Sequence, residues 1–94
     1  MDQLMLQETI ERIQWLEHCL DELQKAAKAD PALIRESGRL KEYFQNLIQY
    51  IESGQWLRDY ELDEKGYLPH NLKRGILAQD MLYNFLEEHR DEFT

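Results

Sequence analysis

The opening stretch of the chain carries the pattern that limits its fold most strongly. Residues 3 to about 28 contain neither glycine nor proline. Their apolar residues recur at spacings of three and four, which is the period of an amphipathic helix. The stripe consists of Leu6, Ile10, Ile13, Leu16, Leu20, Leu23 and Ala27. A long helix with one apolar stripe must bury it against other elements, so the pattern predicts a helical fold.

A second long helix is predicted from about Pro31 to Glu52. Asp30 and Pro31 separate it from the first, because a residue before proline avoids helical backbone and proline suits the first helical position. Its apolar arc is wide, which indicates two packing neighbours. The arc is centred on Leu33, Leu40, Phe44, Leu47 and Ile51. Gly38 should cost about 1 kcal/mol inside a helix; we expect an unbroken helix, with a break at Ser37–Gly38 as the alternative.

The rest of the chain predicts an ordered connector and a shorter third helix. Residues 54–77 hold apolar residues throughout, and a structureless loop of that length is unusual in a compact domain. We expect a short helix after Ser53, a turn at residues 63–66, an extended run and one helical turn. A last helix follows from about Ala78 to Glu92. The predicted fold is all-α, in one domain spanning residues 1–94: a three-helix bundle with two long antiparallel helices, one shorter C-terminal helix and a long connector.

Composition and charge argue against several functions. The net charge is −8, with ten acids and six bases in residues 1–53 and nine acids and five bases in residues 54–94. No basic surface is left for nucleic acid or for an anionic membrane. The longest uncharged run inside the chain, from Tyr43 to Ile51, is too short for a membrane span. A single cysteine fits a reducing compartment, and we expect a cytoplasmic protein.

The sequence shows no recognisable catalytic or metal-binding pattern. His18, His70 and His89 share no ligand spacing with Cys19 or with each other, so we expect no metal and no cofactor. The acids at 59–63 do not make a calcium loop, because the positions that need a glycine and a closing acid hold other residues. Acidic neighbours are expected to raise the pKa of Cys19 and to make it a poor nucleophile. We therefore expect that the chain is not an enzyme.

A motif between residues 53 and 83 resembles a known family. It comprises Trp56-x-x-Asp59, Asp63-Glu64, Gly66, Leu68-Pro69, Leu72-Lys73-Arg74-Gly75-Ile76-Leu77 and Asp80. The family consists of small bacterial proteins classed as a domain of unknown function, and it includes the BlpT-type proteins of bacteriocin-like peptide clusters. Ala78-Gln79 stand where the family often has Ser-Glu, so the serine cap of the last helix is missing, and His70 replaces a small polar residue. The resemblance implies a helical fold and a link to peptide-bacteriocin systems, with no activity to transfer.

Five residues are candidates for binding a partner. Trp15 lies almost opposite the apolar stripe of the first helix; it lies flat on the surface, is covered by the connector, or anchors a partner. Trp56 and Tyr60, four residues apart, form a second aromatic candidate. Lys73 and Arg74 follow four acids. They form either an ion-pair lock that fastens the connector, worth about 0–1 kcal/mol per exposed pair, or an anchor for an anion.

These observations favour a small non-catalytic protein-interaction module. It would bind a protein, a peptide or a second copy of itself through Trp15 and the Trp56–Tyr60 region. The resemblance suggests an accessory or immunity-related role in a bacteriocin-like peptide system. The alternative is a module that binds a small anion or metabolite through Lys73 and Arg74.

Overall fold

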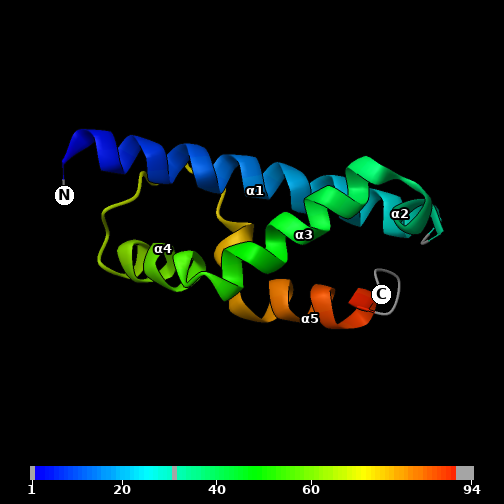
Figure 1. Cartoon of the computed structure of the whole chain (residues 1–94). Coiled ribbons are helices and arrows are strands. Elements are labelled where there is room, and N and C mark those ends of the chain that lie inside the picture. The colour runs from blue at the N-terminus through cyan, green and yellow to red at the C-terminus, as the bar shows by residue number, and fades with distance from the viewer. Residues whose placement is uncertain (1, 31, 91–94) are drawn as a thin grey trace.

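The computed structural model describes residues 2–30 and 32–90 (Figure 1). These residues form helices joined by turns and loops and contain no β-strand, which confirms the all-α prediction. The elements are α1 (Gln3–Ala29), α2 (Ala32–Glu36), α3 (Gly38–Glu52), α4 (Gln55–Glu64), the 3-10 helix η1 (Gly75–Leu77) and α5 (Gln79–His89). No helix within the described ranges is long and apolar enough to cross a bilayer.

The long helix α1 forms one edge of an elongated molecule with extents of 42 × 19 × 17 Å. Asp2 caps it, since its carboxylate accepts a hydrogen bond from the Met5 backbone N–H at 2.9 Å. The predicted stripe faces inward: Ile13 and Leu23 are fully buried, and Leu20 nearly so. The period of apolar residues therefore located this helix correctly, because its buried face follows the helical repeat.

The second long helix is broken, so the prediction of an unbroken helix through Gly38 is wrong. α2 ends at Glu36, and Ser37 adopts extended backbone (φ −93°, ψ 120°). The Ser37 hydroxyl accepts a hydrogen bond from the Leu40 N–H at 3.3 Å, which caps α3. A new helix start leaves N–H groups without partners, and serine supplies one acceptor. The predicted helix start at Pro31 lies outside the described residues.

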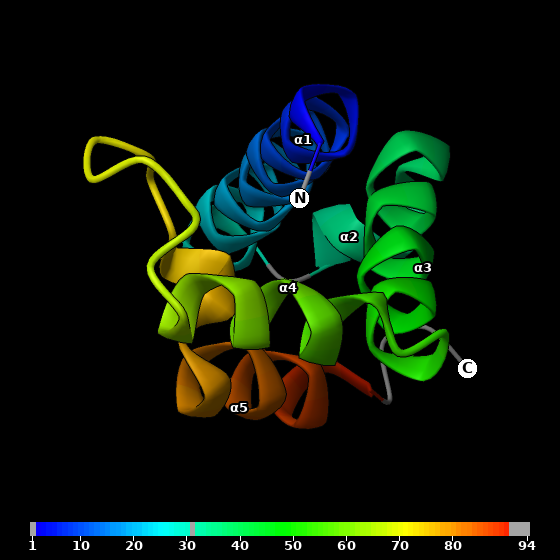
Figure 2. The same cartoon turned by 90° about the vertical axis from the view of Figure 1, so that its left-hand side faces the viewer.

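The connector contains a helix of its own, so a bundle of three helices is too simple a description. α4 begins at Gln55, directly after Ser53 and Gly54 as predicted, and continues to Glu64. Gly54 and Gly66 flank it with positive φ angles of 84° and 80°, backbone that favours glycine. Beyond α4 the loop swings outward and returns to η1 (Figure 2). The predicted single helical turn near residue 77 is η1.

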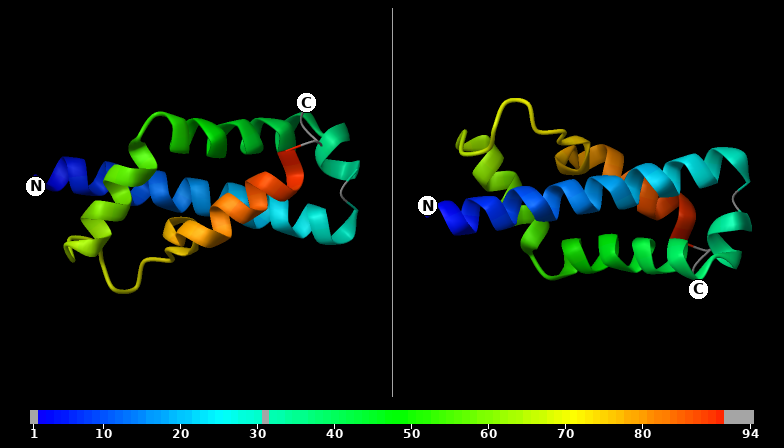
Figure 3. Two further views of the ribbon diagram at one scale, coloured as in Figure 1. Left: turned by 90° about the horizontal axis from the view of Figure 1, so that it is seen from below. Right: turned by 90° about the horizontal axis from the view of Figure 1, so that it is seen from above.

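The two long segments are antiparallel, and α5 crosses diagonally beneath α1 toward α3 (Figure 3, left). α5 begins at Gln79 without a side-chain cap, because Ala78 has no oxygen to offer. Its predicted end at Glu92 lies outside the described residues. One apolar core joins the elements. It includes Ile13, Leu20 and Leu23 of α1, Phe44 and Leu47 of α3, Trp56 of α4, Ile76 of η1, and Leu82 and Phe85 of α5.

Candidate functional site

Trp15 belongs to an exposed cluster of aromatic rings on α1 and α3. It is 48% exposed, and its ring lies edge-on to that of Tyr43, with centroids 5.5 Å apart at 88°. His18 lies 5.8 Å from Trp15 and 5.9 Å from Tyr43. We call Trp15, His18 and Tyr43 the aromatic face. The rings that contact Trp15 therefore belong to α1 and α3.

A cation extends the aromatic face. The Arg39 guanidinium carbon lies 5.8 Å from the centroid of the Tyr43 ring, within the ~6 Å reach of a cation–π contact. Helical spacing places Trp15 and His18 on the same side of α1, three residues apart. Tryptophan, tyrosine and arginine are the residue types that contribute most to binding at protein interfaces. The surface therefore has the composition of a binding site for a protein.

A hollow of about 230 Å³ adjoins Trp15. It is lined by Arg12, Trp15, Leu16, Asn46, Gln49, Tyr50 and Gln55. The three carboxamides among these side chains can each donate and accept hydrogen bonds. The backbone of a bound peptide needs both kinds of partner. The hollow could therefore pair with the backbone of a segment whose side chains contact Trp15.

Trp56 is buried and serves the core, which corrects its candidate role as a surface residue. It is 5% exposed, and its indole Nε1 donates a hydrogen bond to the Ile76 carbonyl at 2.9 Å. Its ring stacks on Tyr60 at 5.3 Å and meets Tyr83 of α5 edge-on at 6.1 Å. Only Tyr60 of the predicted pair remains partly exposed. The indole bond joins residues twenty apart, so local spacing could not reveal it.

Lys73 and Arg74 both form ion pairs with carboxylates. Lys73 Nζ lies 2.6 Å from Asp21 Oδ2 and ties the connector to α1. Arg74 pairs with Asp63 and donates to the Pro69 carbonyl, which ties the connector to itself. Both cations already face carboxylates, and this pairing favours the lock over an anion site.

A buried polar network joins α1, α3 and α4. Asp59 is fully buried and accepts hydrogen bonds from Arg12 Nη2 at 2.6 Å and from Arg12 Nε at 3.0 Å. The Tyr50 hydroxyl donates to the same carboxylate at 2.6 Å. Burial, followed by the bond to Asp59, raises the pKa of Tyr50, and the bond to Asp59 raises the pKa of Arg12. Sequence reasoning missed this network; the only signal was Asp59 one helical turn after Trp56.

Glu17 fixes η1 against α1. Its Oε2 accepts a hydrogen bond from the Ile76 backbone N–H at 2.6 Å, and the carboxylate is buried. A Cβ on Gly75 would lie 2.8 Å from Glu17 Oε1, closer than ordinary contact allows. A larger residue at position 75 would therefore displace the Glu17 carboxylate, whereas positive φ does not occur at this position. Burial raises the pKa of Glu17, and the Ile76 hydrogen bond opposes that effect.

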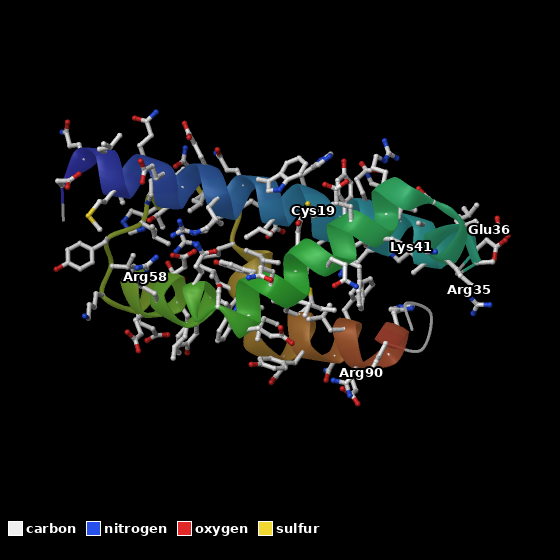
Figure 4. The ribbon with its side chains drawn as sticks, viewed as in Figure 1. Cys19, Arg35, Glu36, Lys41, Arg58 and Arg90 are labelled. Atoms are coloured by element: carbon white, nitrogen blue, oxygen red, sulfur yellow. The ribbon has the colours of Figure 1, made fainter. Side chains whose placement is uncertain are left out.

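Cys19 lies between α1 and α3 (Figure 4) and is fully buried. Burial is the main cause that raises its pKa, to about 11. The predicted direction is right, although the acidic neighbours are not the main cause. Within residues 2–30 and 32–90, no group of three or more His, Cys, Asp or Glu side chains is placed to hold a metal ion.

Most of this chain matches a known protein family. The family described as "Domain of unknown function (DUF4298)" matches residues 13–93, a range that contains the aromatic face, the connector and α5. Comparison with curated proteins and with solved structures gives no significant match. The chain therefore belongs to the family of the domain of unknown function DUF4298.

Proposed function

We propose that this chain is a small non-catalytic interaction module that captures a protein or peptide through the aromatic face. The observation that carries the proposal is Trp15, which stays 48% exposed although Tyr43 and His18 hold its ring. A ring already held by neighbours loses little conformational freedom on binding. Trp15 can therefore act as a preorganised anchor.

The polar groups of the chain support a non-catalytic role. Asp59 and Arg12 are paired with each other, and Tyr50 donates to Asp59. Glu17 is bound to the Ile76 backbone, and Cys19 is buried with a raised pKa. Each of these groups has a structural partner or no access to substrate. Catalysis needs such groups to converge on an accessible pocket.

We further propose that the chain is a cytoplasmic, BlpT-type member of its family with an accessory or immunity-related role in a bacteriocin-like peptide system. The motif in residues 53–83 supports the assignment to the BlpT-type members of the family. The acidic surface and the single buried cysteine support the compartment.

An affinity capture from native cells tests the proposal. Three baits are compared: the wild type, Trp15→Ala, and Leu57→Ala as a matched control on α4 that also removes an exposed large apolar side chain. Circular dichroism first establishes that all three baits are folded. Cytosolic and membrane fractions are analysed separately by mass spectrometry. We expect one enriched partner that the wild type and Leu57→Ala retain and Trp15→Ala loses.

Two results would overturn this proposal. One is a partner retained equally by all three baits. The other is an empty capture together with a chain that remains monomeric in sedimentation equilibrium. Self-association that Trp15→Ala abolishes would identify the partner as a second copy of the chain.

A further inference from the structure

A second surface lies on a different side of α3 from the aromatic face. There α3 and α5 border a cavity of about 270 Å³. Figure 1 shows α5 lying below α3, and Figure 3 shows its C-terminal end approaching α3. The apolar side chains that line the cavity are Phe44, Ile48, Ile51, Tyr83 and Leu86. None of them belongs to the aromatic face, so this surface can be tested separately.

The cavity suits a protruding side chain better than a whole small molecule. Its volume is below the ~300–1,000 Å³ of typical ligand pockets. Ile48, Ile51 and Leu86 are only partly buried, and Tyr83 is 46% exposed. Covering apolar surface of this kind with a partner lowers the free energy, because the surface is removed from water. One or two apolar side chains of a partner would fill the space.

The charge around the cavity specifies the partner further. Glu52 and Glu87 also line it, and neither forms an ion pair with another described residue. Glu52 ends α3, whose last turn holds no basic residue, so the partial negative charge of the helix C-terminus adds to the carboxylate. Arg90, at the far end of α5 (Figure 4), is the only cation among the lining residues. The cavity and its surroundings are therefore negative, as is the chain with its net charge of −8.

We propose that the cavity between α3 and α5 binds a basic amphipathic helical segment of another protein. An apolar side chain of that segment enters the cavity, and lysine or arginine side chains one turn away pair with Glu52 and Glu87. A helix can do both at once, because residues three or four apart lie on the same face. The proposal is independent of the partner bound by the aromatic face.

The test uses two labelled peptides of roughly 15 residues, long enough to form a helix on binding. Both carry leucine along one helical face; the first has lysine elsewhere and the second has glutamate. Binding is followed by fluorescence anisotropy. We expect the leucine–lysine peptide to bind and the leucine–glutamate peptide not to bind. Affinity should fall as salt rises from ~0.01 M to ~1 M, because the Debye length shrinks from ~30 Å to ~3 Å.

Matched variants locate the site. Glu52→Lys with Glu87→Lys should weaken binding of the leucine–lysine peptide about tenfold at low salt. The control pair, Glu36→Lys with Glu61→Lys, changes two exposed acids away from the cavity and gives the same net charge. It should change the affinity by less than about threefold.

Two further variants complete the test. Ile48→Gln removes an apolar wall of the cavity and should weaken binding about tenfold, whereas Trp15→Ala should leave binding unchanged. If circular dichroism shows that Ile48→Gln is unfolded, the variant with Glu52→Lys and Glu87→Lys still tests the proposal, because both of these side chains are exposed.

Several outcomes would overturn the proposal. They are equal weakening by the two charge-reversal pairs, equal binding of both peptides, no binding of either, or full affinity in a folded Ile48→Gln variant. A dimer that folded Ile48→Gln dissociates in sedimentation equilibrium would assign the cavity to a second copy of the chain and would also overturn it.

Discussion

Asp59 is fully buried, and two helices besides its own hold its carboxylate. Arg12 of α1 contacts both carboxylate oxygens, and Tyr50 of α3 donates to one of them. No buried side-chain nitrogen or oxygen of the described residues lacks a partner. Removing one member of such a network leaves the others buried without compensation, which costs more than the pair itself contributes.

We predict that Asp59→Asn destabilises the fold strongly. It removes the counter-charge of Arg12 and one or more acceptors of this network, and the expected loss is about 3 kcal/mol of unfolding free energy. Urea denaturation followed by circular dichroism measures it. Asp63→Asn is the control, because Asp63 pairs with Arg74 nearer the surface and should lose no more than about 1 kcal/mol.

Replacing all three side chains tests whether the loss of stability comes from polar groups left buried without partners. Arg12→Met, Tyr50→Phe and Asp59→Leu together replace these three polar side chains with apolar ones. They leave the Thr9 hydroxyl, which accepts a hydrogen bond from Arg12 Nη2 at 3.3 Å in the wild type. This triple variant should recover most of the lost stability, because apolar replacements of buried ion pairs are often neutral or stabilising. A loss for Asp59→Asn no larger than that for Asp63→Asn would contradict the account.

The burial of Glu17 predicts that the unfolding free energy depends on pH. Burial raises its folded-state pKa above the usual value of 4.5. Its contribution to stability is therefore fully present below about pH 4.5 and is lost as the pH rises through the folded-state pKa. Glu17→Gln keeps a carbonyl acceptor for Ile76 and lacks this titration. As the pH falls from neutral to 4.5, the unfolding free energy of the wild type, measured by urea denaturation, should rise relative to that of Glu17→Gln. Parallel curves would contradict the raised pKa.

At the scale of elements, the sequence predicts those helices whose buried face is continuous. The stripe of α1 gave its bounds to within about one residue, and the spacing of Trp56 and Tyr60 indicated α4 after Ser53. The break before α3 was predicted only as the alternative to an unbroken helix, because periodic apolar residues continue on both sides of Ser37. Whether a serine caps a new helix there depends on how α2 packs beside α3, and local spacing does not contain that information.

We predict opposite effects for neighbouring substitutions at this break. Ser37→Ala removes the cap of α3 and should lower the unfolding free energy by about 1 kcal/mol. Gly38→Ala should raise it by about 0.4–1 kcal/mol, because nothing lies within 4 Å of the added Cβ and its φ is not positive. Thermal denaturation of both variants provides the measurement. A helix that is in fact continuous would show no loss for Ser37→Ala.

The candidate site was predicted in part. Trp15 was identified because it departs from the apolar stripe, and Lys73 and Arg74 because acids precede them. Their partners were not identified: Tyr43 lies 28 residues from Trp15 in sequence, and Asp21 lies 52 from Lys73. Contacts of this range depend on how the helices are packed, and no spacing rule along one helix reveals them.

At the scale of the molecule, α3 separates two surfaces with different chemistry. The aromatic face on one side consists of Trp15, His18 and Tyr43, with Arg39 beside it. The cavity against α5 is apolar with acidic residues around it. Beneath both, Asp59 and Glu17 fasten α4 and η1 to α1. Two separate surfaces on one apolar core support the proposed role of an interaction module.

The most direct test of this function is the affinity of the purified chain for the partner that it captures. Isothermal titration calorimetry would compare the wild type, Trp15→Ala and Leu57→Ala. A central tryptophan anchor contributes about 2 kcal/mol or more, so Trp15→Ala should raise the Kd about 30-fold while Leu57→Ala changes it less than about threefold. An unchanged Kd for folded Trp15→Ala would contradict the claim that the aromatic face is the binding site.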